Sequence, residues 1–90
     1  MNGTIYMHRN KINNKVYIGQ TTQSCQSRWK HDGSGYKSQS KFYNAIKKYG
    51  WDNFEHIILE ENLTSNEADI REAFWIEAFN STNPEKGYNI

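Results

Sequence analysis

The stretch from Gly3 to Thr21, GTIYMHRNKINNKVYIGQT, constrains the fold of this chain more than any other. Around Ile5 and again around Val16, β-branched and aromatic residues alternate with period two, which is the pattern of a half-buried strand. The polar segment between these two parts is rich in asparagine, which favours a turn because Asn tolerates left-handed backbone angles. The stretch therefore predicts a β-hairpin.

The register of this hairpin stays open. A turn centred near Lys11 would place Tyr6 opposite Tyr17. A turn centred two residues later would place Asn10 opposite Tyr17. In both registers Tyr6 and Tyr17 lie on the same face, because side chains alternate strictly along a strand. The pair is either an aromatic cross-strand contact or part of a site, where Gly19 would let a ligand approach the backbone.

Two helices and a third strand are expected after the hairpin. Within residues 22–31, TQSCQSRWKH, a short helix is expected to carry His31 one turn beyond its apolar face. A second helix begins at Ser38 or Ser40 and shows one apolar stripe, with Gly50 just past its end. Alternating residues over 54–59 then predict a strand.

A last helix is indicated by a capping box, in which Thr64 is followed three residues later by Glu67. It is expected to run to about Asn80. Apolar residues recur with the helical repeat on two sides of this helix, so we expect both sides to be buried. One stripe consists of Ile70, Ala73 and Phe74, and the other of Ala68, Glu72, Trp75, Ile76 and Phe79.

The element order β-β-α-α-β-α predicts an α+β fold, a three-stranded sheet packed by helices, in a single domain over residues 1–90. Cys25 is the only cysteine, which excludes an internal disulfide and a cysteine-based zinc site. The sequence shows no signal peptide and no apolar run of membrane length, so a cytoplasmic setting is expected.

Charge is divided unevenly along the chain, although the formal net charge is only +1. Residues 1–48 hold nine Lys or Arg and one acid, whereas residues 49–90 hold two basic residues and nine acids. Such asymmetry favours a polyanionic partner on the basic side, or pairing of the two halves with each other.

Several segments resemble the GIY-YIG nuclease family. The motifs Thr4-Ile5-Tyr6 and Tyr17-Ile18-Gly19 match its signature. Arg28-Trp29-Lys30, the segment 71–76 and the closing Gly87-Tyr88-Asn89 match its later motifs, so the resemblance covers nearly all of the chain. It implies a small antiparallel sheet flanked by helices.

Glu72 falls inside an apolar helix stripe, where an unpaired carboxylate is costly. It forms an ion pair with a nearby Lys or Arg, it lies as a carboxylate at the rim of the core, or it binds a metal. The resemblance to the family places the single catalytic glutamate at Glu72, as the ligand of Mg²⁺ or Mn²⁺. One carboxylate together with phosphate oxygens and waters is a usual way of holding magnesium.

The resemblance also implies the other catalytic residues. Arg28 would clamp the scissile phosphate, for which a guanidinium is suited. Tyr17 would be the general base for the attacking water and Tyr6 would orient it, although the sequence allows their roles to be exchanged. His31 and Asn89 complete the set.

These assignments predict a metal-dependent endonuclease that hydrolyses double-stranded DNA, either as a monomer or as a dimer, in the cytoplasm of a cell or of a host. The alternative is a non-catalytic nucleic-acid-binding module of the same fold, and a protein-binding adaptor would leave Glu72 unexplained. Lys37 stands where some family members have a further His. The lysines expected to bind DNA are Lys30, Lys37, Lys41, Lys47 and Lys48.

Overall fold

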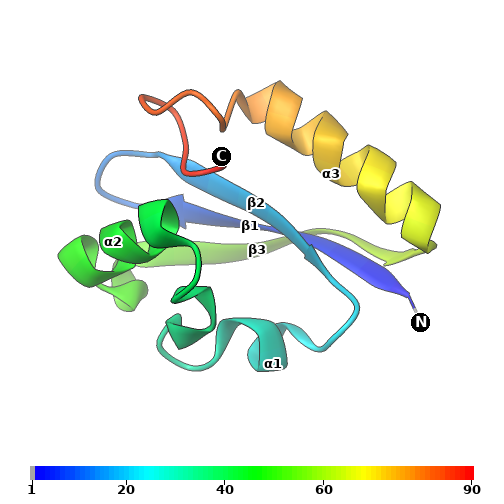
Figure 1. Ribbon diagram of the computed structural model, residues 1–90, viewed down its shortest axis with the longest axis horizontal. Coiled ribbons are helices and arrows are strands. Elements are labelled where there is room, and N and C mark those ends of the chain that lie inside the picture. Colours follow the sequence, from blue (N-terminus) through cyan, green and yellow to red (C-terminus); the bar gives the residue numbers. More distant parts are fainter. Residues whose placement is uncertain (1) are drawn as a thin grey trace.

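The computed structural model describes residues 2–90, so only Met1 of the predicted domain lies outside it. It contains one antiparallel sheet with strand order β2-β1-β3 and helices on both faces (Figure 1), which confirms the predicted fold class. The strands are β1 (Gly3–Asn10), β2 (Val16–Thr21) and β3 (Phe54–Leu63). The helices are α1 (Cys25–Trp29), α2 (Ser40–Tyr49) and α3 (Ser65–Phe79), with 3-10 turns η1 (Ser34–Tyr36) and η2 (Trp51–Asn53).

The hairpin register lies between the two that the sequence left open. Tyr17 pairs with His8, and Tyr6 pairs with Gly19. Neither expected partner of Tyr17 is therefore correct, because the turn adopts a geometry centred between the two alternatives, with Asn14 in the left-handed region at φ 65°. The prediction that Tyr6 and Tyr17 share a face is confirmed, since the pairing shifts by an even number of residues from either alternative.

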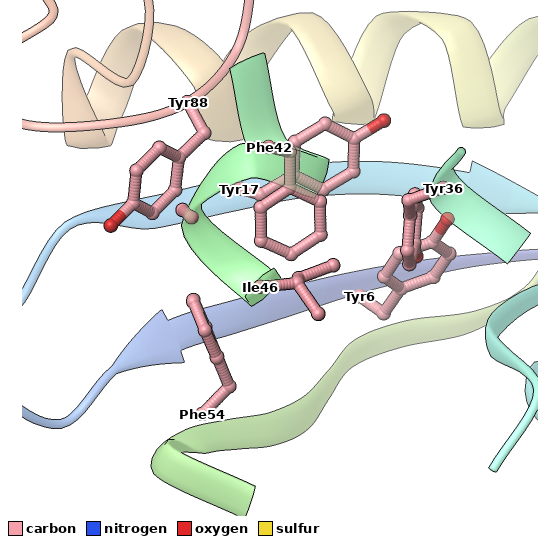
Figure 2. Close-up of a cluster of buried hydrophobic side chains, with 8 residues drawn as sticks. Tyr6, Tyr17, Tyr36, Phe42, Ile46, Phe54 and Tyr88 are labelled. Atoms are coloured by element: carbon pink, nitrogen blue, oxygen red, sulfur yellow. The ribbon is translucent and has the colours of Figure 1, made fainter. Parts of the chain in front are cut away.

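Each face of the sheet has its own core. The face that carries the two tyrosines is covered by α1, α2 and the 3-10 turns, and the opposite face is covered by α3 (Figure 1). The first core consists of Tyr6, Tyr17, Tyr36, Phe42, Ala45, Ile46, Phe54 and Tyr88, most of which are drawn in Figure 2. The second consists of Ile5, Met7, Val16, Ile18 and Ala68.

The first helix is shorter than predicted. Its N-cap is Ser24, whose side chain accepts from the backbone N–H of Ser27. It ends at Trp29, because Lys30 takes φ 61° and turns the chain away. The prediction that His31 lies one turn further along this helix is therefore wrong, and His31 is exposed in the turn that follows.

Burial of α3 on two sides is also wrong. The predicted capping box is present, but Ala68 is the one buried residue of the helix. In the other stripe Ile70 is 67% exposed and Phe74 is 47% exposed. The reason is that α3 forms the outer layer over one face of the sheet, so a single side of it packs (Figure 1). Within residues 2–90, the helices lack the combination of length and apolarity that crossing a membrane requires.

The C-terminal segment covers the outer edge of β2. Gly87 forms a parallel bridge with Val16, and Tyr88 and Asn89 are buried. The Asn89 side chain accepts from the backbone N–H of Ile18 at 2.9 Å and donates to its carbonyl at 2.8 Å. This tail was predicted as a loop, and its side-chain amide replaces the hydrogen bonds that a further strand would make.

Candidate active site

Tyr6 and Tyr17 meet on the face covered by α1 and α2. Tyr6 lies directly over Gly19, where a Cβ atom would come within 2.6 Å of the Tyr6 hydroxyl. This glycine therefore makes room for Tyr6, and not for a ligand as the sequence suggested. The ring of Tyr17 stacks parallel on Phe42, with centroids 4.5 Å apart. In Figure 2 both hydroxyls lie at the end of the cluster nearest Tyr36.

Arg28 is held beside these phenols. Its Nη1 donates to the Gly35 carbonyl at 2.7 Å, and its guanidinium carbon lies 4.3 Å from the centre of the Tyr36 ring. Its positive charge also acts on Tyr17, whose pKa it lowers against the larger effect of burial. A side chain at Gly35 would collide with the Arg28 carbonyl, so the glycine lets η1 pack against α1. The structure thus brings Arg28 to the tyrosine pair.

A buried polar network supports this arrangement. His8 is fully buried; its Nε2 lies 2.8 Å from the Tyr36 hydroxyl and its Nδ1 lies 2.9 Å from Nδ1 of His56. The ring of Tyr6 packs against His8, with centroids 5.1 Å apart. Burial, together with the neighbouring His56 and Arg28, lowers the pKa of His8 well below its usual value, so this imidazole is neutral at pH 7.

The two phenols of the pair are also neutral in the free protein. Burial raises the pKa of Tyr17 to about 12, and it raises the pKa of Tyr6 in the same way. The Arg28 guanidinium opposes this rise at both residues because it stabilises a phenolate, whereas Glu72 adds to it. Glu72, which belongs to α3 on the other face of the sheet, is thus among the charges that act on both tyrosines.

Glu72 is half-buried, and its Oε1 accepts from Nε2 of Gln20 at 3.0 Å. The same Gln20 nitrogen donates to Oδ1 of Asp69 at 2.9 Å. Arg71, the basic residue next in sequence, pairs with Glu60 instead, at 2.7 Å. Among residues 2–90 Glu72 takes part in no ion pair. The interpretation of Glu72 as half of a structural ion pair is therefore wrong for this part of the chain.

The donor set fits a hard divalent cation. In the described chain no three His, Cys, Asp or Glu residues gather as a metal cluster, so a metal here would need oxygens from water and substrate. Magnesium is commonly bound in that way, through one or two carboxylates plus phosphate oxygens. Glu72 can supply one such carboxylate, since Oε1 is the oxygen that Gln20 engages.

The family model of the GIY-YIG catalytic domain matches residues 2–89. The chain belongs to the GIY-YIG family. Its structure is similar to the catalytic domain of the homing endonuclease I-TevI, with a TM-score of 0.78 and 32% identity, over 98% of this chain and 97% of that domain. A glutamate-to-alanine mutant of that domain gives the same TM-score at 33% identity, over 99% and 93% of the two chains.

Two viral proteins are related in sequence. Intron-associated endonuclease 1 of Enterobacteria phage T4 is 38% identical over 95 residues, which cover all of this chain and 37% of the phage protein. A putative MSV199 domain-containing protein of Invertebrate iridescent virus 6 is 39% identical over 61 residues, 66% of this chain and 25% of that protein. The GIY-YIG domain therefore spans about a third or less of these relatives.

Within residues 2–90, the remaining predicted site residues of this GIY-YIG domain form no hydrogen bond or ion pair with the tyrosine pair or with Glu72. His31 is exposed in the turn after α1, and the Asn89 side chain is engaged by the backbone of Ile18. Their catalytic roles stay predictions. Lys41 donates to the Asn89 carbonyl at 3.2 Å. The other lysines of the predicted DNA surface, Lys30, Lys37, Lys47 and Lys48, are exposed.

Three supporting residues were not expected as part of the site. Tyr36 lies in a 3-10 turn, which gives no periodic signal, and His8 was predicted only as a sheet residue. The available signal for His8 was its position two residues after Tyr6, on the same face of β1. Gln20 directly follows the Tyr17-Ile18-Gly19 motif but lies on the other face of the sheet, where its hydrogen-bond partners come from α3, which is distant in sequence.

Proposed function

We propose that this GIY-YIG domain is a divalent-metal-dependent endonuclease that hydrolyses phosphodiester bonds in double-stranded DNA, one strand at a time. The observation that carries the proposal is a buried Tyr17 on which the charges of Arg28 and Glu72 both act, where the carboxylate of Glu72 has no cationic partner among residues 2–90. These are the group types that in-line hydrolysis at phosphorus requires: a proton acceptor, a guanidinium and a metal-binding carboxylate.

Tyr17 is proposed to orient the attacking water and to accept its proton. A phenol with a pKa of about 12 is protonated at neutral pH, so Tyr17 would act from the minor phenolate fraction, whose proton has passed to the solvent. Arg28 favours that loss because it stabilises the phenolate, and it also stabilises the charge that develops on the phosphate. Tyr6, which packs against His8, would hold the pair of phenols in place.

Glu72 would hold Mg²⁺ or Mn²⁺, which when bound supplies electrostatic stabilisation to the phosphate and the leaving oxygen. Gln20 holds one oxygen of this carboxylate, so its direction is set before a metal arrives. A carboxylate kept half-buried without a counter-charge is costly, and the cost is explained if the site is built for a cation.

Supercoiled plasmid incubated with the protein and Mg²⁺, with EDTA as the control, tests this function. Glu72→Gln keeps the shape of the side chain and removes its charge. We expect this variant to lose cleavage, to unfold no more easily than the wild type, and to show no Mg²⁺-dependent rise in melting temperature. Glu77→Gln, an exposed position on the same helix, is the matched control and should cleave normally.

Two results would contradict the proposal. A Glu72→Gln variant that is destabilised but still cleaves DNA would make Glu72 a structural residue. Salt-dependent DNA binding by the wild type, without turnover in Mg²⁺ or Mn²⁺, would instead identify a non-catalytic binding module of the same fold.

A further inference from the structure

Gln20 connects the two sides of the candidate site. It follows Gly19 directly on β2, so their side-chain positions lie on opposite faces of the sheet. The Gly19 side accommodates Tyr6, whereas Gln20 reaches to α3 on the other face. The tyrosine cluster and Glu72 are thus joined through two consecutive residues of one strand.

The amide of Gln20 is divided between two carboxylates. Its Nε2 lies 2.9 Å from Oδ1 of Asp69 and 3.0 Å from Oε1 of Glu72, and an amide nitrogen has two protons to give. Asp69 and Glu72 are three residues apart on α3, so they are neighbours of like charge that repel each other. A neutral bridge fixes both carboxylates and leaves their charge available, which a lysine at this position would not do.

We propose that Gln20 is a positioning residue for Glu72. It donates to Oε1, which fixes the orientation of the carboxylate and leaves the second oxygen to bind a cation. The inference rests on the proposed metal-binding role of Glu72. Hydrogen-bonding partners of a metal ligand typically change metal affinity or activity by about 10- to 100-fold when they are removed, so the expected effect is measurable.

Gln20→Met tests the inference, because it keeps the length of the side chain and removes both donors. We expect the Mg²⁺ concentration for half-maximal plasmid cleavage to rise by about 10-fold or more. A titration of the DNA-free protein with Mn²⁺, followed by melting temperature, should show the same shift in half-saturation. Gln26→Met, at an exposed position of α1, is the control and should leave both values unchanged.

A second measurement uses the unmodified chain. The side-chain amide signal of Gln20 in an NMR spectrum is identified by its loss in Gln20→Met, and it should move when Mg²⁺ is added. If Glu72→Gln is inactive but Gln20→Met keeps the wild-type half-saturation, and the amide signal does not move, Gln20 has no positioning role. If Glu72→Gln cleaves normally, it is the proposed function that fails.

Discussion

At the scale of single residues, the decisive quantity is the acidity of Tyr17. Burial against Phe42 and the sheet raises its pKa to about 12, and the adjacent Arg28 is the group that lowers it. A residue that must lose a proton to act then becomes more active as pH rises, because a larger fraction is phenolate. In the proposed mechanism, burial therefore makes the Tyr17 phenolate a strong base that is scarcely populated at neutral pH.

Tyr17→Phe should lower kcat by about 10²-fold or more while leaving the fold intact, because general base catalysis is typically worth that much. The wild-type kcat/KM should rise about tenfold per pH unit between pH 7 and 9, well below the pKa of about 12, and this rise should be lost in the variant. Plasmid cleavage at fixed Mg²⁺ across this range measures both.

Tyr43→Phe, on α2 and partly exposed, is the control for removing a phenol hydroxyl. Near-normal cleavage by folded Tyr17→Phe would take the base role away from Tyr17, and Tyr6 would then be the next residue to test.

The sequence predicted the residues whose types carry chemistry by themselves. Tyr6 and Tyr17 could be selected because a phenol pair on one face is unusual locally, and Glu72 because it is a carboxylate in an apolar stripe, whereas Arg28 was assigned through the family resemblance. Gln20 could not be selected in this way, since its importance comes from hydrogen bonds to residues about fifty positions away. Tertiary proximity of that kind has no local signature.

At the scale of elements, strand β2 is fixed from its outer edge by the C-terminal segment. Both backbone groups of Ile18 are satisfied by the Asn89 side chain, one residue from Tyr17. The Asn89 carbonyl accepts from Lys41, which ties the tail to α2 as well. Asn89 thus acts on the site through the strand that carries Tyr17, in addition to any role toward substrate that the family resemblance implies.

Asn89→Asp should destabilise the fold by about 1–3 kcal/mol, because a carboxylate cannot donate to the buried Ile18 carbonyl and leaves it unpaired. For a domain of this size the melting temperature should fall by roughly 10 °C. Asn44→Asp, an exposed position on α2, introduces the same charge and should have little effect. Equal melting curves for the two variants would show that the Asn89 contact does not hold β2.

Element boundaries were predicted well where local signals were strong. The capping box at Thr64 and Glu67 and the apolar stripe of α2 both appear as expected. The end of α1 was missed because a lysine gives no sequence signal for the positive φ that Lys30 adopts. The exposure of Ile70 was missed because periodicity shows that a helix has apolar sides without showing how many of them are covered.

At the scale of the whole molecule, the uneven charge of the sequence becomes a separation between layers. The predicted DNA-binding lysines belong to α1, η1 and α2 or the turns beside them, on the tyrosine face of the sheet (Figure 1). The helix α3, on the opposite face, carries acids at positions 67, 69, 72 and 77. Of the two ion pairs found in residues 2–90, the Arg9–Glu55 pair alone joins the two halves of the sequence, so the halves do not mainly neutralise each other.

This separation predicts that DNA binding by the domain is driven by phosphate contacts on the tyrosine face. Affinity should fall with salt, and the log–log slope should be close to ~0.9 times the number of phosphates neutralised. Replacing the four exposed lysines, Lys30, Lys37, Lys47 and Lys48, with alanine should therefore lower both the affinity and the slope. Fluorescence anisotropy with a labelled duplex, in Ca²⁺ or EDTA to prevent cleavage, measures both over a range of salt concentrations.

Lys86→Ala is the matched control, because Lys86 is an exposed lysine in the acidic half of the sequence, remote in sequence from the lysines of the tyrosine face. It should leave the slope unchanged, whereas each phosphate-contacting lysine of the other set should reduce the slope by close to ~1. An affinity that does not change from low to physiological salt would contradict binding through phosphates. If the four-lysine variant and the wild type have the same slope of log affinity against log salt concentration, DNA binds to a different face of the domain.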